Sequence, residues 1–348
     1  MSIAPHAFLY YRSAVFSIFQ QYLRLPRTVK VVAVGRILNS MGSFVVILST
    51  PLLTQHLGLG AAAAGAWLFA AQAAFLVGSL AAGWALDHYG KIWILAITLL
   101  ANAAAFFTGA YTTRVVLVGG SLILGYFFHG AWRPSMIAIA ADETAENDHA
   151  VAFSLMYFVH NIGYLIAPVA AGVLFAWNPR SVFAADAASS VLSAAVVLVG
   201  TGTALRAFRP AAPAPPAHEP GNDGFIATIL RDRPLLLFTA AFVLVQFTYA
   251  QVSFALPLTT IARLGEHGTE AYGWIMAANA GIVLALAPPL TALTRRWNAV
   301  TAIALTAALY LVGFGALVFV RTLPLLFLTA LVWTTGEVLM AIHINVFV

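Results

Sequence analysis

The sequence predicts an all-α polytopic membrane protein built from two parallel pseudo-repeats, with ten helices present of an expected twelve. Hydrophobic residues make up 61% of the 348 residues and charged residues only 8%, whereas a soluble domain carries about 25% charged residues. Ten apolar runs are long enough for a spanning helix, which needs about 20 residues. A similarity between two distant segments predicts the repeat.

The predicted elements fall into four segments. Residues 1–30 form a basic N-terminal segment, either an interfacial helix or a disordered tail. Residues 31–204 form a six-helix bundle, with helices predicted at 31–55, 63–86, 91–111, 115–140, 150–177 and 181–204. A linker rich in Pro and Ala occupies 205–234. A C-terminal bundle of four helices fills 235–348, with helices predicted at 235–262, 271–293, 298–320 and 323–348.

The distribution of positive charge predicts the orientation. If the N-terminus is cytoplasmic, most Lys and Arg residues outside the spans lie on the cytoplasmic side. Because such residues favour that side, we expect a multi-pass protein of the cell (inner) membrane with its N-terminus in the cytoplasm.

The repeat relates AGAWLFAAQAAF (64–75) to AYGWIMAANAGI (271–282). Matched positions are Trp67 with Trp274, Gln72 with Asn279 and, just upstream, Pro51 with Pro257. By this alignment Val348 corresponds to the end of the fourth helix, so two more helices are expected after it. An unusual ten-helix protein is the alternative.

The composition also excludes several function classes. With no cysteine in the sequence, disulfides, thiolate metal sites and a Cys nucleophile are excluded. The net charge of +5 is small and dispersed, so no nucleic-acid partner is expected. A membrane enzyme would need a catalytic constellation, and the chain has no Gly-x-Ser-x-Gly, His-Glu-x-x-His or phosphate-binding Gly-rich loop. We therefore expect no enzyme, no cofactor and no metal site, and a lipid bilayer as surroundings.

Two segments resemble signatures of the major facilitator superfamily over a region from about residue 31 to 348. GWALDHYGK (83–91) resembles its loop 2–3 signature, with matches at Gly83, Asp87 and Gly90 and a basic residue kept at Lys91. GYLIAPVAAG (163–172) is similar to a motif of its drug:proton antiporters, with Gly163, Pro168 and Gly172 matching and Ala167 in place of a glycine. Residues 133–142 and 333–341 look like helices four and ten of bacterial multidrug members.

The resemblance implies a major facilitator fold and a secondary active transporter. It implies proton-coupled efflux of amphipathic or drug-like small molecules by a monomer, so the expected partners are a small-molecule substrate and protons. The alternatives are an uptake symporter, an exporter of another small metabolite, or a non-transporting scaffold. The resemblance implies that the loop motif latches a gate through Asp87, which in the family faces helix eleven, and a solvated loop acid is the alternative. Because a helix C-terminus disfavours an anion, we also expect a partner for this carboxylate, such as Lys91, a nearby Arg or the N-terminus of another helix.

Polar stripes at helical spacing predict the substrate path, because polar groups that face lipid are costly. The path residues are Arg36, Asn39 and Ser43 on the first helix, Arg133 on the fourth, Tyr157 and Asn161 on the fifth, and Gln246 and Tyr249 on the seventh. Hydrogen bonding between helices is the alternative for each. Two intramembrane carboxylates, Glu337 and Asp186, are proton-coupling candidates, although a local ion pair with Arg180 is expected for Asp186.

Overall fold

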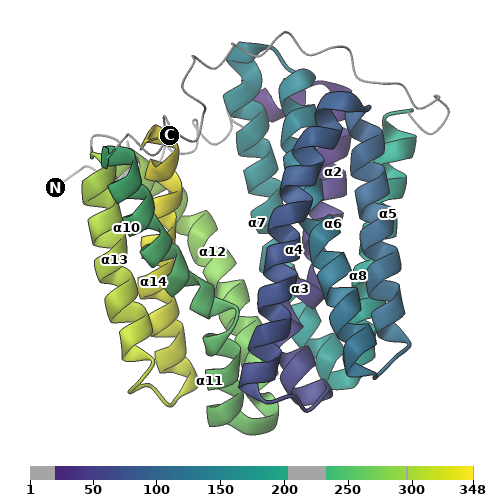
Figure 1. The fold of residues 1–348 in the computed structure, drawn as a ribbon. Coiled ribbons are helices and arrows are strands. Elements are labelled where there is room, and N and C mark those ends of the chain that lie inside the picture. Colours follow the sequence, from purple (N-terminus) through teal and green to yellow (C-terminus); the bar gives the residue numbers. More distant parts are fainter. Residues whose placement is uncertain (1–19, 203–232, 295–296, 348) are drawn as a thin grey trace. The chain divides into compact units, whose positions relative to one another are not determined.

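The structure is a computed structural model that describes residues 20–202, 233–294 and 297–347. Within these ranges the regular elements are all helices (Figure 1). The basic segment 1–30 is described only from residue 20, and nearly all of the predicted linker 205–234 lies outside the described residues.

The helices of the first half follow the predicted spans closely. They are α2 (Arg27–Met41), α3 (Phe44–Pro51), the π-helix η1 (Leu52–His56), α4 (Ala61–His88), α5 (Lys91–Ala110), α6 (Val115–Asp142), the 3-10 helix η2 (Glu146–Asp148), α7 (His149–Trp177) and α8 (Pro179–Gly200). The first predicted span is therefore not one helix, because it breaks between α2 and α3.

The second half continues with the same architecture. Its elements are α10 (Arg233–Tyr249), η4 (Ala250–Val252), α11 (Ala255–Leu264), η5 (Gly265–His267), α12 (Gly268–Thr294), α13 (Ala299–Ala316) and α14 (Leu323–Phe347). In the described part of the chain, eight helical segments are long and apolar enough to cross a membrane. One of them, Thr239–Thr291, covers 53 residues and holds two predicted spans, and α13 adds a shorter apolar helix. All ten predicted spans are helical, which confirms the fold class.

Specific features accompany the breaks in the first and seventh spans. At the first break Gly42 ends α2, and the backbone N–H of Val45 in α3 donates to Asp186 Oδ2 on α8 at 3.0 Å. In the seventh span, η4 separates α10 from α11, and Pro257 lies in the first turn of α11. Proline is tolerated there because the first N–H groups of a helix have no intrahelical acceptor.

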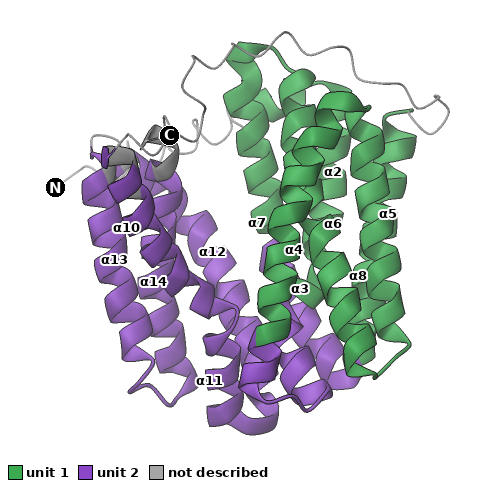
Figure 2. Cartoon of the chain, viewed as in Figure 1, with its two compact units in different colours: residues 1–46, 66–163, 180–213 green, residues 47–65, 164–179, 214–348 purple. Residues whose placement is uncertain are grey.

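The helices pack into two compact units (Figure 2). Unit 1 comprises residues 1–46, 66–163 and 180–213, and unit 2 comprises 47–65, 164–179 and 214–348. Unit 2 thus contains the second part of the first span and the second part of α7 together with the C-terminal helices.

The core of unit 1 joins α2, α5, α6, α7 and α8. Its members include Val29, Val32, Leu95, Leu99, Trp132, Met136, Met156 and Val197. Small residues allow the closest crossing in this unit: a side chain at Gly78 on α4 would overlap the backbone carbonyl of Phe127 on α6. Close backbone approach at glycine is typical of helix contacts in membranes.

Large aromatic side chains fill the core of unit 2. Trp333, Tyr272 and Tyr310 are among the largest fully buried side chains of the described residues. On α13, a side chain at Gly313 would press against the backbone and Cβ of Trp333 on α14, with the nearest atoms at 2.9 Å. The pair α13–α14 therefore packs tightly and carries several of the aromatic rings described below.

Candidate functional site

A partly buried carboxylate lies at the centre of a polar cluster in unit 2. Glu337 Oε2, on α14, accepts a hydrogen bond from Asn279 Nδ2 on α12 at 2.7 Å. The same amide nitrogen donates to Thr334 Oγ1, one turn before Glu337, at 3.0 Å. The hydroxyl of Tyr249, on α10, also hydrogen-bonds to Glu337. Two helices, α10 and α12, thus bring donors to one carboxylate on α14.

Aromatic rings surround this carboxylate. Tyr249 stacks on Tyr310 with ring centroids 5.9 Å apart, and it meets Trp333 edge-on at 6.4 Å. Phe314 stacks on the other side of Trp333 at 5.6 Å. The Oη atom of Tyr310 and the Nε1 atom of Trp333 are buried, and neither has a hydrogen-bond partner among the described residues.

The chemistry of this cluster suits a positive charge. Aromatic faces attract cations, and a carboxylate in an apolar setting binds either a proton or an organic cation more readily than it stays bare. The sequence identified Glu337 and Tyr249, but it missed Tyr310, Trp333, Thr334 and Asn279 as site residues. The signal for Asn279 was its match with Gln72 in the repeat, which places an amide at the same position of both halves.

In unit 1, most polar residues of the first span bond to neighbouring helices. Arg36, Asn39 and Ser43 are buried, each exposing 3% or less of its surface. Asn39 Nδ2 donates to Ser190 Oγ on α8 at 3.4 Å, and Ser43 Oγ donates to the Asn39 carbonyl at 3.0 Å. Helix-to-helix bonding, the alternative from the sequence, therefore describes the observed contact of Asn39, whereas Ser43 bonds within its own span. Their place in a substrate path stays a prediction.

The other predicted path residues differ in exposure. Tyr157 and Gln246 are exposed on α7 and α10, and Arg133 is exposed on α6. Asn161 is buried, and its Nδ2 donates back to the Tyr157 carbonyl at 2.9 Å. Tyr249 is the member of this set that reaches the Glu337 cluster.

Asp186 holds the break in the first span. Its carboxylate accepts hydrogen bonds from the backbone N–H groups of Val45 and Phe44, at the start of α3. These N–H groups begin a helix and have no intrahelical partner, so Asp186 caps α3 from a neighbouring helix. This geometry gives Asp186 a structural role, and its ion pair with Arg180 stays a prediction.

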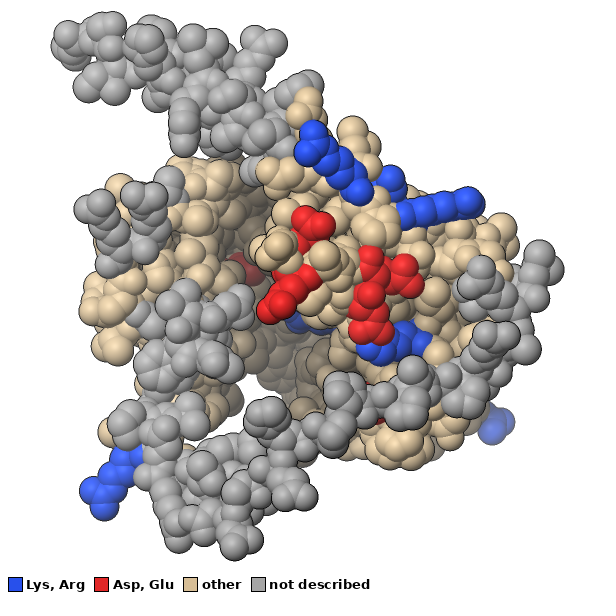
Figure 3. Space-filling view, turned by 90° about the horizontal axis from the view of Figure 1, so that it is seen from above, with Lys and Arg blue, Asp and Glu red and all other residues tan. Residues whose placement is uncertain are grey.

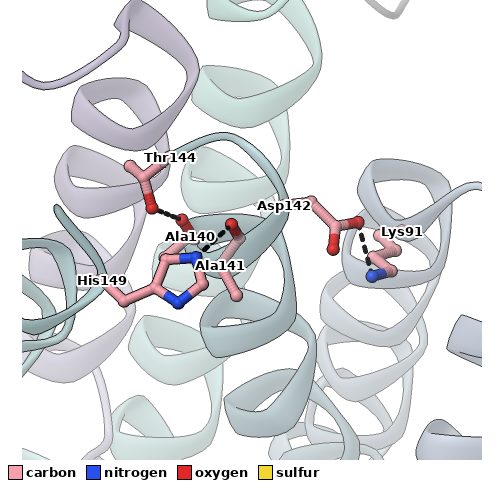
Figure 4. A network of polar contacts seen from close by, with 6 residues as sticks. All are labelled: Lys91, Ala140, Ala141, Asp142, Thr144 and His149. Atoms are coloured by element: carbon pink, nitrogen blue, oxygen red, sulfur yellow. Dashed lines mark hydrogen bonds and ion pairs between the residues drawn. The ribbon is translucent and has the colours of Figure 1, made fainter. Parts of the chain in front are cut away.

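The loop motif joins α4 to α5. Asp87 lies in the last turn of α4 and is exposed, and Gly90 is the N-cap of α5. Lys91 forms its ion pair with Asp142 at the end of α6, at 2.5 Å, rather than with Asp87 (Figure 4). The space beside Gly83 is open, with no described atom within 4 Å of an added Cβ, so no close helix approach is observed at that glycine.

The α6–α7 connection continues this polar network. His149 Nε2 lies 3.0 Å from the Ala141 carbonyl, and Thr144 Oγ1 donates to the Ala140 carbonyl at 2.7 Å (Figure 4). The connection also carries the exposed acids Glu143, Glu146 and Asp148. Seen from this end, acidic side chains gather in one patch with Lys and Arg side chains nearby (Figure 3).

The antiporter-like motif on α7 forms tight helix contacts at several points. In unit 1, a side chain at Gly163 would overlap Ser40 on α2. In unit 2, a side chain at Gly273 on α12 would press on the carbonyl oxygen of Pro168, and one at Gly172 would lie 3.4 Å from Glu270 Cα. Ala167 is fully buried. The small residues of the motif therefore form a packing ridge.

Comparison with known proteins agrees with this architecture. The family described as Major Facilitator Superfamily matches residues 32–348. The chain is 24% identical over 327 residues to the uncharacterized MFS-type transporter YttB of Bacillus subtilis (strain 168), covering 90% of this chain and 78% of that protein. It is 25% identical over 329 residues to YqjV of the same organism, also an uncharacterized MFS-type transporter, covering 90% and 75%.

Two solved structures show the same fold. The crystal structure of tetrameric PepTSo2 superposes with a TM-score of 0.70 at 15% identity, covering 90% of this chain and 82% of that chain. A bacterial homolog of the human lysosomal transporter Spinster, in an inward-facing and unoccupied conformation, gives 0.66 at 15% identity, covering 90% and 73%. The chain belongs to the major facilitator superfamily, and it is a multi-pass membrane transporter of small molecules.

Proposed function

We propose that the protein is a proton-coupled exporter of amphipathic small molecules that works by alternating access. In this proposal it acts as a monomer in the inner membrane with its N-terminus in the cytoplasm. The observation that carries the coupling is Glu337, a carboxylate placed among aromatic rings and held by an amide and a tyrosine hydroxyl. Such a group binds a proton when no other cation is present, so protons and a substrate compete for it.

Between the two candidate carboxylates, the contacts favour Glu337 for coupling. The carboxylate of Asp186 accepts hydrogen bonds from two backbone N–H groups at the start of a helix. Any change at Asp186 therefore also disturbs the fold. The partners of Glu337 are side chains on α10 and α12. Side chains rotate to follow a change in protonation at little cost, whereas a helix start does not.

Aromatic rings with few fixed charges also support an amphipathic substrate. A sugar needs many hydrogen bonds, whereas the Glu337 cluster offers mainly ring faces and a small number of polar atoms. The outer-end contacts of unit 2 support alternating access. There Thr50 Oγ1 donates to the Ser253 carbonyl at 2.8 Å, and Thr269 Oγ1 donates to Gln55 Oε1 at 2.7 Å. These are single hydrogen bonds between helix ends, and such bonds can break and form again at low cost in free energy.

A proton-flux assay tests the coupling role of Glu337. The full chain is reconstituted in proteoliposomes that contain a pH-sensitive dye, and amphipathic cations and neutral amphiphiles are added in turn. We expect substrate addition to change the internal pH with the native chain and not with Glu337→Gln. The matched control is Glu270→Gln, an exposed carboxylate at the start of α12. Full proton movement with Glu337→Gln would exclude Glu337 as the coupling residue.

The same assay separates the alternatives. An uptake symporter would move protons in the same direction as the substrate, and a non-transporting scaffold would give no substrate-dependent signal at all. If the signal is lost with Asp186→Asn in a stably folded protein but kept with Glu337→Gln, the coupling carboxylate is Asp186.

A further inference from the structure

Basic side chains from three helices gather inside unit 1. Arg36, on α2, is 3% exposed, and its guanidinium carbon lies 5.3 Å from the ring centre of Trp132 on α6. Arg133 follows Trp132 directly, and His129 precedes Arg133 by one helical turn. His160, on α7, lies with its Nδ1 3.0 Å from Ser40 Oγ, one helical turn after Arg36 on α2, so a second histidine reaches the same part of unit 1.

Hydrogen bonding fixes the direction in which His129 presents its proton. The indole Nε1–H of Trp132 donates to His129 Nδ1 at 3.0 Å. An indole N–H is only a donor, so Nδ1 must carry a lone pair and the ring proton lies on Nε2. Trp132 therefore acts twice, because its ring face also holds the Arg36 guanidinium. The result is a set of preorganised donors: two guanidinium groups and one imidazole N–H.

The carboxylates of this unit are engaged elsewhere. Among the described residues of unit 1, Asp186 is the one carboxylate inside a span, and it accepts from the backbone N–H groups of Val45 and Phe44. The other acids lie at the helix ends, where Asp142 pairs with Lys91. The cluster thus places two arginines inside apolar spans, where arginine is costly and is normally kept for function.

We propose that Arg36, Arg133 and His129 form a binding site for one oxyanion group, a carboxylate or a phosphate. A planar guanidinium group can donate two parallel hydrogen bonds to the oxygens of such a group. The His129 Nε2–H adds a further donor. Arg36 is held by Trp132, while Arg133 is the exposed member through which the anion enters. The inference rests on the proposed function in one respect: the anion is the acidic group of a transported compound, so the substrates include amphipathic acids.

A binding experiment on the purified full chain tests this site without transport. Thermal unfolding in detergent is followed while benzoate, inorganic phosphate or, as a cationic comparison, phenethylammonium is titrated at constant ionic strength. We expect benzoate to raise the midpoint of unfolding. The apparent Kd should weaken about 10- to 100-fold in Arg36→Gln and Arg133→Gln, because each removes charged hydrogen bonds. Arg114→Gln, an exposed position at the start of the same helix as Arg133, is the matched control.

Each outcome decides the inference. Benzoate binding alone assigns the site to an organic acid, and phosphate binding with the same dependence on Arg36 and Arg133 assigns it to a free inorganic anion. No anion binding, or binding unchanged in both variants, overturns the site. If Arg36→Gln does not fold, Arg36→Lys keeps the charge but loses the planar fork and should weaken binding in the same direction. If no anion binds but proton flux still depends on Glu337, only the anion site is refuted. If anions bind but no proton flux is seen, only the coupling proposal is refuted.

Discussion

Replacing Asp186 with alanine would remove the acceptor of two backbone N–H groups at the start of α3. The carboxylate of Asp186 bonds to Val45 N at 3.0 Å and to Phe44 N. Val45 is fully buried and Phe44 is partly buried. The Phe44 N–H also donates to the Gly42 carbonyl at 2.7 Å, so the Val45 N–H is the group for which water or another side chain would have to replace the lost acceptor.

The expected cost follows mainly from the Val45 bond. A buried donor left without an acceptor costs about 1–3 kcal/mol. Because the Phe44 N–H keeps the Gly42 carbonyl as an acceptor, we expect about 1–3 kcal/mol for Asp186→Ala. Asp186→Asn keeps one oxygen acceptor and should cost about 1 kcal/mol.

Equilibrium unfolding in mixed micelles measures these free energies. Asp148→Ala, which removes an exposed acid in the same unit, is the control and should change the free energy of unfolding by less than about 0.5 kcal/mol. If Asp186→Ala is as stable as this control, Asp186 does not cap α3 in the membrane protein. The capping argument would then be wrong, and the proton-coupling role predicted from the sequence would become the better explanation of this buried acid.

Two further predictions concern the helix ends and crossings. Lys91→Gln breaks the ion pair with Asp142. Since both side chains are partly exposed, the free energy of unfolding should fall by less than about 1 kcal/mol. A larger fall in a denaturant titration would contradict this prediction. Gly78→Ala places a methyl group against the Phe127 carbonyl and should cost about 1–3 kcal/mol. Gly83→Ala, on the same helix but beside open space, should be tolerated in the same unfolding experiment, and equal effects at the two glycines would refute the packing explanation.

The spans were predictable because a bilayer imposes a simple requirement on length and polarity. Every apolar run of the sequence is helical in the structure, and most ends agree within a few residues. The break in the first span was not predicted, because its sequence is apolar throughout and the group that caps the new helix start comes from Asp186, far along the chain.

In the candidate site, too, the residue types were predictable and the contacts between helices were not. The sequence identified Glu337 and Tyr249 as polar residues in apolar helices, since such residues are conspicuous by type alone. It did not identify Asn279 or Tyr310 as their partners, because contacts across α10, α12, α13 and α14 depend on how the helices rotate about their axes. Lys91 was one candidate partner of Asp87 in the sequence, and the structure pairs it with Asp142 on α6.

The sequence by itself determined that this protein is a polytopic helical membrane protein, where its helices lie, and which charged residues stand inside them. Those properties follow from the energy of transfer into lipid, which each segment carries independently. Only the tertiary structure decided which polar residue meets which: Asp186 with the start of α3, Glu337 with Asn279, and Arg36 with Trp132. These contacts are decided by packing between segments far apart in the chain, where a small rotation of one helix exchanges one partner for another.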